Sequence, residues 1–167
     1  MAKRSKVDTS RTIQLILDNA NQQLLTVGYE NMSYTTLSLA TELSRTGISH
    51  HFPKKTDFLT ALEGRFLKQL IDRLIINEGS SQLEQSWRKA LLNSEFSAIL
   101  KLVFHHSVIR SEHCFFSQRL MTNLSNIIAL HLGESAHRQV EHLLGVSLVH
   151  IANQNATIST EGTLDNV

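Results

Sequence analysis

Apolar residues recur at three- and four-residue spacing along most of the chain, and this pattern constrains the fold more than any other feature. Such spacing places apolar side chains on one face of a helix. The 167 residues include one Pro and seven Gly, too few turn formers for a fold of many short strands. Hydrophobic residues make up 41% of the chain, enough for a sizeable core. The sequence therefore predicts an all-α fold.

Caps and breaks place the first helices. A polar residue among 8–10 can cap a first helix, which Gly28 ends in a left-handed turn. Ser33 and Ser44 can cap two short helices. In the first of these, Leu37 and Ala40 are expected to face the core. Three helices within some fifty residues predict a compact N-terminal unit.

The remaining helices follow Pro53, which rules out a simple continuation of the third helix. Apolar spacing predicts them at about 55–76, 83–91, 96–109, 115–132 and 136–151. The polar residues 153–167 lack periodicity and are expected to form a frayed, disordered tail. The predicted organisation is an N-terminal arm and helical unit at 1–54, a second helical domain at 55–152, and the tail at 153–167.

Residues 37–57 have the form of a helix-turn-helix. In the second short helix, Ile48 and Phe52 stand four apart and can point into a core. The opposite face carries small polar and basic side chains, namely Arg45, Thr46, Ser49 and His50. Such a face can enter the major groove of DNA.

The net charge of +1 is too small for a protein that is basic over its whole surface. Basic residues are instead concentrated at the start of the chain and around the motif, at Lys3, Arg4, Lys6, Arg11, Arg45, Lys54 and Lys55. This distribution predicts a local basic footprint. For the first six residues alone, a solvated tail is the better interpretation.

Four features follow one another in order along the N-terminal third: Gly28-Tyr29, Leu43-Ser44-Arg45, His50-His51-Phe52-Pro53 and Lys55. With them, residues 11–62 resemble the DNA-binding domain of the TetR (tetracycline repressor-like) family of bacterial transcription regulators. The resemblance implies a ligand-responsive repressor that acts as a homodimer on a palindromic operator in double-stranded DNA. It also implies a helical second domain for dimerisation and ligand binding.

The resemblance assigns tasks to individual side chains. Arg45 would donate two N–H groups to a guanine, and Thr46 would touch a thymine methyl group or a base acceptor. Ser49, His50 and Lys55 would bind phosphates. The full set of expected DNA-binding residues is Thr36, Ser44, Arg45, Thr46, Ser49, His50, Lys54 and Lys55.

Three positions depart from the family pattern. Glu42 stands in the turn where the family commonly has Gly, so a positive φ is expected there at a cost of roughly 1 kcal/mol. Ser49 replaces an aromatic residue that packs on the DNA backbone. Lys54 replaces the usual Ser or Thr cap, so Thr56 or Asp57 must help to satisfy the first turn of the next helix. His51 is expected to be a partly buried, hydrogen-bonded histidine.

The second half offers two expectations. An apolar stripe on the last helix predicts a dimer interface at Val140, Leu144, Leu148 and Ile151. A cavity that admits a small apolar ligand could be lined by Phe66, Trp87, Phe96, Leu100, Val103, Phe104, Phe115 and Met121. Ordinary core packing is the stronger interpretation of that aromatic cluster.

No cofactor, metal site or enzymatic activity is expected. His105 and His106 are adjacent on a helix and point about 100° apart, so they cannot bind one ion together with His113 and Cys114. No nucleophile stands with a base in a catalytic pattern. The lone Cys114 cannot form an intramolecular disulfide, and no apolar run is long enough to cross a membrane. These features indicate a cytoplasmic, nucleoid-associated protein.

Two alternatives remain open. A TetR-like protein can serve a chromosome-associated role other than gene control, and the motif does not separate the two roles. The chain could also be a helical ligand-binding or protein-binding module with a decayed DNA-binding motif, which Glu42 and Ser49 leave open.

Overall fold

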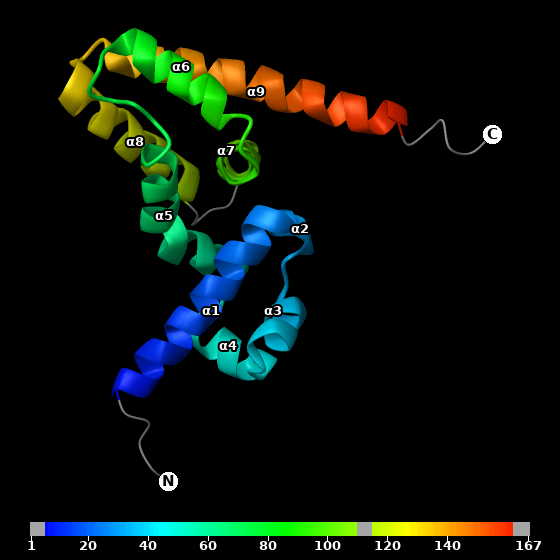
Figure 1. The fold of residues 1–167 in the computed structure, drawn as a ribbon. Helices are drawn as coiled ribbons and strands as arrows, with labels where there is room; N and C mark the ends of the chain where they lie inside the picture. Colours follow the sequence, from blue (N-terminus) through cyan, green and yellow to red (C-terminus); the bar gives the residue numbers. More distant parts are fainter. Residues whose placement is uncertain (1–5, 110–114, 162–167) are drawn as a thin grey trace.

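The computed structural model describes residues 6–109 and 115–161, and within these ranges the chain forms nine α-helices and no strand, which confirms the all-α prediction (Figure 1). The first four helices make the N-terminal unit, and α5 leads into the C-terminal half. The helices are α1 (Lys6–Thr26), α2 (Gly28–Asn31), α3 (Tyr34–Thr41), α4 (Arg45–His51), α5 (Lys55–Ile71), α6 (Ser80–Ala90), α7 (Ser94–Val108), α8 (Phe116–Leu132) and α9 (Ala136–Glu161). In none of these ranges is a helix long and apolar enough to cross a bilayer.

The predicted caps form in the N-terminal unit. The Ser33 hydroxyl accepts from the Thr36 amide at 3.1 Å, while the Thr36 hydroxyl accepts from the Ser33 amide at 2.9 Å. The Ser44 hydroxyl accepts from the Gly47 amide at 3.0 Å. The expectation for Ala40 was wrong, because α3 turns Leu37 and Thr41 toward the core and leaves Ala40 exposed.

Gly28 has the predicted positive φ, at 81°. It does more than end α1, however, because it also opens α2, a four-residue helix that the sequence did not predict. The reversal brings α2 beside α7 of the other half of the chain.

Two helix ends differ from the prediction. Helix α5 stops at Ile71 rather than near residue 76, yet Leu74 stays buried beyond its end. The Leu74 amide there donates to the Ile71 carbonyl at 2.9 Å, so a tightened turn carries the apolar pattern past the helix. Helix α9 continues to Glu161, so the expected tail is wrong for residues 153–161. Residues 162–167 lie outside the described ranges.

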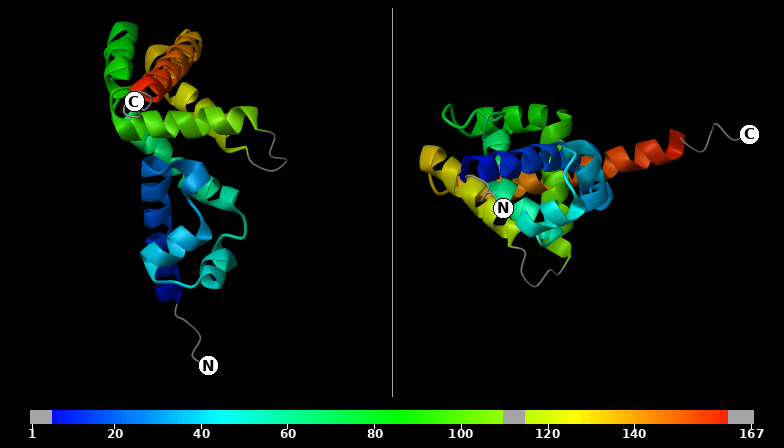
Figure 2. Two further views of the ribbon diagram at one scale, coloured as in Figure 1. Left: turned by 90° about the vertical axis from the view of Figure 1, so that its right-hand side faces the viewer. Right: turned by 90° about the horizontal axis from the view of Figure 1, so that it is seen from below.

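In the C-terminal half, α8 packs against α5, α7 and α9. Helix α6 lies along α9, and the last part of α9 extends beyond the other helices (Figures 1 and 2). Helix α1 connects the N-terminal unit to this half, because it packs against both α5 and α7. The Arg65 guanidinium on α5 fastens α1 by donating to Asp18 and Gln14, each at 2.5 Å.

Candidate nucleic-acid interface and its link to the second half

The turn between α3 and α4 contains Glu42 in the left-handed region, with φ 58° and ψ 17°. This confirms the positive φ predicted for a position where the family commonly has Gly. The Ser38 hydroxyl donates to the Leu43 carbonyl at 2.6 Å across the turn. The turn between α3 and α4 therefore accommodates Glu42 in the left-handed region, at the conformational cost of a non-Gly residue.

Helix α4 is anchored by one face and free on the other. Ile48 is fully buried and Phe52 nearly so, as predicted. Arg45 and Thr46 are exposed on the opposite face, with His50 at its end. Within the described part of the chain the Arg45 guanidinium has no hydrogen bond or ion pair, so it does not pair with the nearby Glu42. Its five N–H donors are available to a ligand.

The other residues predicted at or near the DNA interface differ in exposure and in their partners. Ser49 is partly buried, and its hydroxyl donates to the Thr46 carbonyl at 3.2 Å. His51 is partly buried as expected, with its ring 5.4 Å from that of His50. Lys54 is exposed, and its amide donates to the Asp57 carboxylate at 2.7 Å. That bond confirms Asp57 as the residue that helps to cap α5. The Lys3 and Arg4 predictions fall outside the described residues.

Two of the expected DNA-binding residues are engaged inside the protein. The Thr36 hydroxyl donates to the Gln23 side-chain oxygen at 2.6 Å. The Lys55 ammonium group lies 4.3 Å from the centroid of the Tyr29 ring and donates to the Glu30 carbonyl at 3.4 Å. Burial lowers the pKa of Lys55, partly opposed by the Glu30 charge. In this conformation Lys55 joins α5 to α2.

Lys55 belongs to a cluster of polar and aromatic side chains that the sequence did not predict. Its members are Tyr29 and Glu30 on α2, Lys55 on α5, and His105 and His106 on α7. The Glu30 carboxylate lies 3.3 Å from Nε2 of His105. The His106 ring meets the Tyr29 ring edge-on at 4.4 Å. His106 is 9% exposed, and its Nε2 has no partner among the described residues. This cluster joins the N-terminal unit to α7.

Burial lowers the pKa of His106 to about 4, helped by the charges of His105 and Lys55 and opposed by Glu30. Unfolded chains protonate this histidine near its ordinary pKa of 6.5, so they bind a proton that the folded protein does not bind above pH 4. Stability contributed by the neutral ring is therefore present above pH 6.5 and lost as the pH falls toward 4.

We expect His106→Phe to reduce the stability lost between pH 7 and pH 5. Between these pH values the variant should lose about 2 kcal/mol less of its free energy of unfolding than the wild type, which is the linkage energy of a group with this pKa shift. Urea denaturation of both proteins at the two pH values measures it. An equal pH dependence in the variant would show that His106 takes up its proton equally well in both states.

The aromatic residues of the second half form a packed core. The rings of Phe66 and Phe116 are 5.9 Å apart, and those of Trp87 and Phe96 are 5.5 Å apart. Phe115 was expected to join them, but it is 57% exposed. The next residue, Phe116, points into the core instead, because one residue along a helix is a rotation of about 100°. Of the other expected pocket residues, Leu100 and Val103 are buried and Phe104 and Met121 are partly buried.

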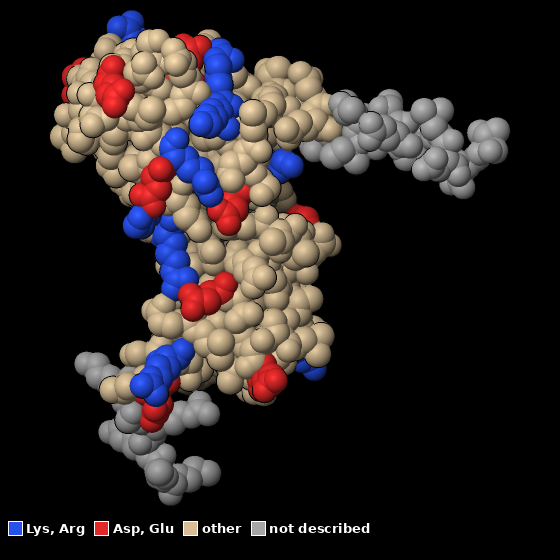
Figure 3. Space-filling model, viewed as in Figure 1, with Lys and Arg blue, Asp and Glu red and all other residues tan. Residues whose placement is uncertain are grey.

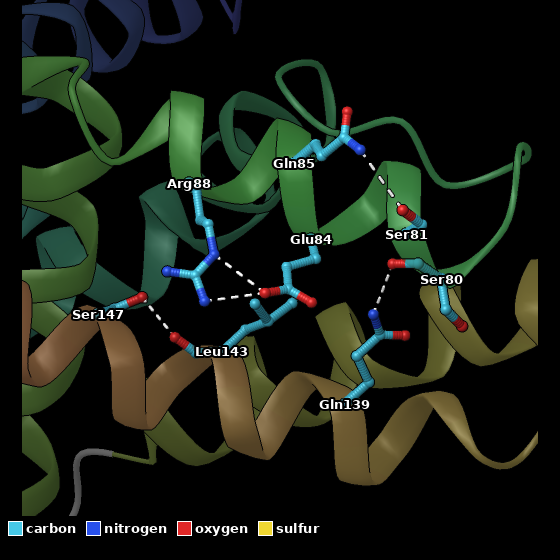
Figure 4. Close-up of polar contacts among 8 residues, drawn as sticks. All are labelled: Ser80, Ser81, Glu84, Gln85, Arg88, Gln139, Leu143 and Ser147. Carbon is cyan, nitrogen blue, oxygen red and sulfur yellow. Dashed lines mark hydrogen bonds and ion pairs between the residues drawn. The ribbon is translucent and has the colours of Figure 1, made fainter.

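Helices α6 and α9 are joined by polar contacts as well as by this core (Figure 4). The Trp87 indole N–H donates to the buried Ser147 hydroxyl at 2.8 Å, and that hydroxyl donates to the Leu143 carbonyl at 2.7 Å. At the other end of the pair, the Gln139 amide donates to the Ser80 carbonyl at 2.6 Å.

The residues expected at a dimer interface divide into two groups. Val140 and Ile151 are 2% and 6% exposed, because α9 turns them into the core of their own chain. They therefore do not form an exposed stripe. Leu144 is partly buried, and Leu148 is 51% exposed. The free face of α9 thus carries Leu148 and its neighbour Val149, which is 61% exposed.

Among the described residues no group of three His, Cys, Asp or Glu side chains is placed to hold a metal ion. The rings of His105 and His106 contact each other at 4.8 Å in an edge-on arrangement. His113 and Cys114 lie outside the described ranges.

Comparison with known proteins bears on the second half, which carries no motif of its own. No curated protein matches the chain. A family model described as the tetracycline repressor LuxT C-terminal domain matches residues 63–151, more than half of the chain. The matched region runs from within α5 to the middle of α9 and adjoins the residues that carry the TetR-like motif. The chain therefore belongs to the tetracycline repressor family of transcription regulators, with a C-terminal domain of the LuxT type.

Proposed function

We propose that the protein is a sequence-specific DNA-binding repressor that acts as a homodimer on a palindromic operator and is released by a ligand. The observation that carries the proposal is the exposed Arg45, which has no partner among the described residues, on a short helix anchored by Ile48. Arginine in this position can bind a guanine through two N–H groups in the major groove. The family shown by the C-terminal half agrees with this role, which requires no enzymatic activity.

The distribution of charge supports a local DNA footprint. On the face shown in Figure 3, Lys and Arg side chains alternate with Asp and Glu. Three arginines of the C-terminal half that pair in this way are Arg65, Arg73 and Arg88. In the described part of the chain, Arg45 and Lys54 have no such carboxylate partner. Arg45 and Lys54 thus place positive charge without a carboxylate partner at the proposed helix-turn-helix, where phosphates would neutralise it.

Binding to random duplex DNA at 50 and 200 mM salt tests the DNA-binding function. We expect affinity to fall with salt, because each neutralised phosphate releases counterions. The absence of salt-dependent binding would instead identify a helical module with a decayed motif. Genomic footprinting then separates the remaining roles: sites at promoters support gene control, whereas sites spread far from promoters indicate another chromosome-associated, nucleoid-bound role.

The homodimer is expected to form through the free face of α9. Leu148 and Val149 are exposed there, and small residues on the same side, Gly145 and Ala152, allow a second helix to approach closely. The last part of α9 also extends beyond the other helices (Figure 2). Two recognition helices held about 34–36 Å apart could then read both halves of a palindrome.

We expect Leu148→Glu to convert dimers into monomers, because it places an unpaired charge in the seam between two α9 helices. Leu148 is half exposed in the single chain, so the variant should still fold. Light scattering after size exclusion measures the mass. Leu15→Glu, an exposed leucine on α1, is the matched control and should remain dimeric. A wild-type monomer at micromolar concentration would contradict both the interface and the palindrome.

A further inference from the structure

A groove of about 640 Å³ lies between the two halves of the chain. One wall is the end of α1 and the whole of α2, and the other is α7. Its floor is apolar, with Leu24, Leu91 and Leu102 almost fully buried. None of the aromatic residues expected to line a ligand cavity borders this groove. It is therefore separate from the packed core of the second half.

Two polar side chains on the α7 wall lack partners. Ser97 is 6% exposed and lines the groove, and its hydroxyl has no hydrogen bond among the described residues. The oxygen itself has almost no accessible surface, so it lies behind the groove wall, where an unpaired hydroxyl costs the fold about 1–3 kcal/mol. Lys101 follows one turn along the same face of α7. Its exposed ammonium group has no ion pair in the described structure.

The remaining charges of the groove do not neutralise Lys101. The carboxylate that lines the groove, that of Glu30, is already directed to His105 at 3.3 Å. An unpaired cation beside an apolar floor favours a ligand that combines an anionic group with a hydrocarbon body.

We propose that this groove binds a small amphipathic carboxylate. Its hydrocarbon part lies against the apolar lining where Val27 and Leu92 are exposed, and its carboxylate accepts from the Lys101 ammonium group. Because the walls belong to the N-terminal unit and to α7, the occupant contacts both halves of the chain at once. The proposal goes beyond the proposed function in naming the site and the ligand class. Binding at the groove itself needs no DNA.

Calorimetric titration of the full chain with decanoate, in the absence of DNA and below micelle formation, tests the proposal. We expect saturable binding of decanoate and at least tenfold weaker binding of decanol, which lacks the negative charge. Absence of saturable decanoate binding, or equal affinity for the two probes, would overturn the assignment. The titration contains no DNA, so its failure is distinguishable from a failure of the DNA-binding function.

Variants locate the site. Lys101→Ala should weaken decanoate binding at least tenfold, and Ala98→Phe, which fills the groove from the α7 wall, should abolish it. Lys89→Ala is the matched control, an exposed lysine outside this groove, and should bind as the wild type does. Circular dichroism checks that Ala98→Phe folds. If Ala98→Phe does not fold, Lys101→Ala alone tests the site, because its change is at an exposed position. If Lys101→Ala bound decanoate with wild-type affinity, the site would be wrong. The proposal would also be wrong if the wild type bound no decanoate and Ala98→Phe no longer formed dimers, because a second copy of the chain would then cover the groove.

Discussion

Replacing Arg45 by Ala should weaken binding of the dimer to its operator by about 2–6 kcal/mol, since each half-site is deprived of a bidentate contact that contributes about 1–3 kcal/mol. The guanidinium is exposed on α4 and unpaired within the described structure, so its removal leaves the fold unchanged. Base preference should relax at one position in each half-site. Fluorescence anisotropy with operator and random duplexes measures both effects.

Lys54→Ala is the matched control for this experiment. Lys54 is exposed at the start of α5, and its capping bond to Asp57 uses the main-chain amide, which Ala retains. We expect the variant to bind all sequences more weakly by the same factor and to lower the salt slope by about one for each phosphate that Lys54 neutralises. Lys55 is a poorer control, because its ammonium group also packs on Tyr29. If Arg45→Ala weakened operator and random DNA equally, Arg45 would bind a phosphate instead of a base.

Trp87→Ala should lower the free energy of unfolding by about 3–5 kcal/mol, the usual cost of removing a fully buried aromatic side chain. The change opens a cavity beside Phe96 and removes the hydrogen bond to Ser147 that joins α6 to α9. Urea denaturation followed by circular dichroism measures the loss, since the variant lacks the tryptophan fluorescence of the wild type.

Ser147→Ala isolates the polar part of that effect. It leaves the indole N–H buried without an acceptor, which should cost about 1–3 kcal/mol. In Trp87→Phe the same serine change should cost much less, because no indole N–H remains to be left unpaired. Equal costs of the serine change in both backgrounds would show that the hydrogen bond contributes nothing to stability.

Local signals made the short helices α3 and α4 and the turn between them predictable. The caps at Ser33 and Ser44, the positive φ at Glu42 and the help from Asp57 each depend on residues within a few positions of one another. Backbone geometry at that range follows directly from residue type.

Features that depend on packing between distant segments were not predictable in the same way. Tyr29 and His106 meet although α3, α4, α5 and α6 lie between them in sequence. The inward ring at the start of α8 is that of Phe116 rather than Phe115, because one residue is a rotation of about 100° and apolar spacing alone does not fix the phase at a helix end. Polar composition likewise concealed the continuation of α9, since a helix keeps its backbone hydrogen bonds without an apolar stripe.

The packing of α1 against α5 and α7 determines the order in which this protein can become stable during synthesis. The ribosome releases the N-terminal unit first, while the residues that cover α1 from the other half have not yet been made. The part of α1 that packs on α7 stays open to solvent until α7 has been made, and Asp18 lacks its Arg65 partner until α5 has emerged. A nascent chain that ends at Pro53 therefore holds α1 to α4 but only part of the packing that supports them. Helix α4 acquires its fixed position late, after segments far along the chain have packed on α1.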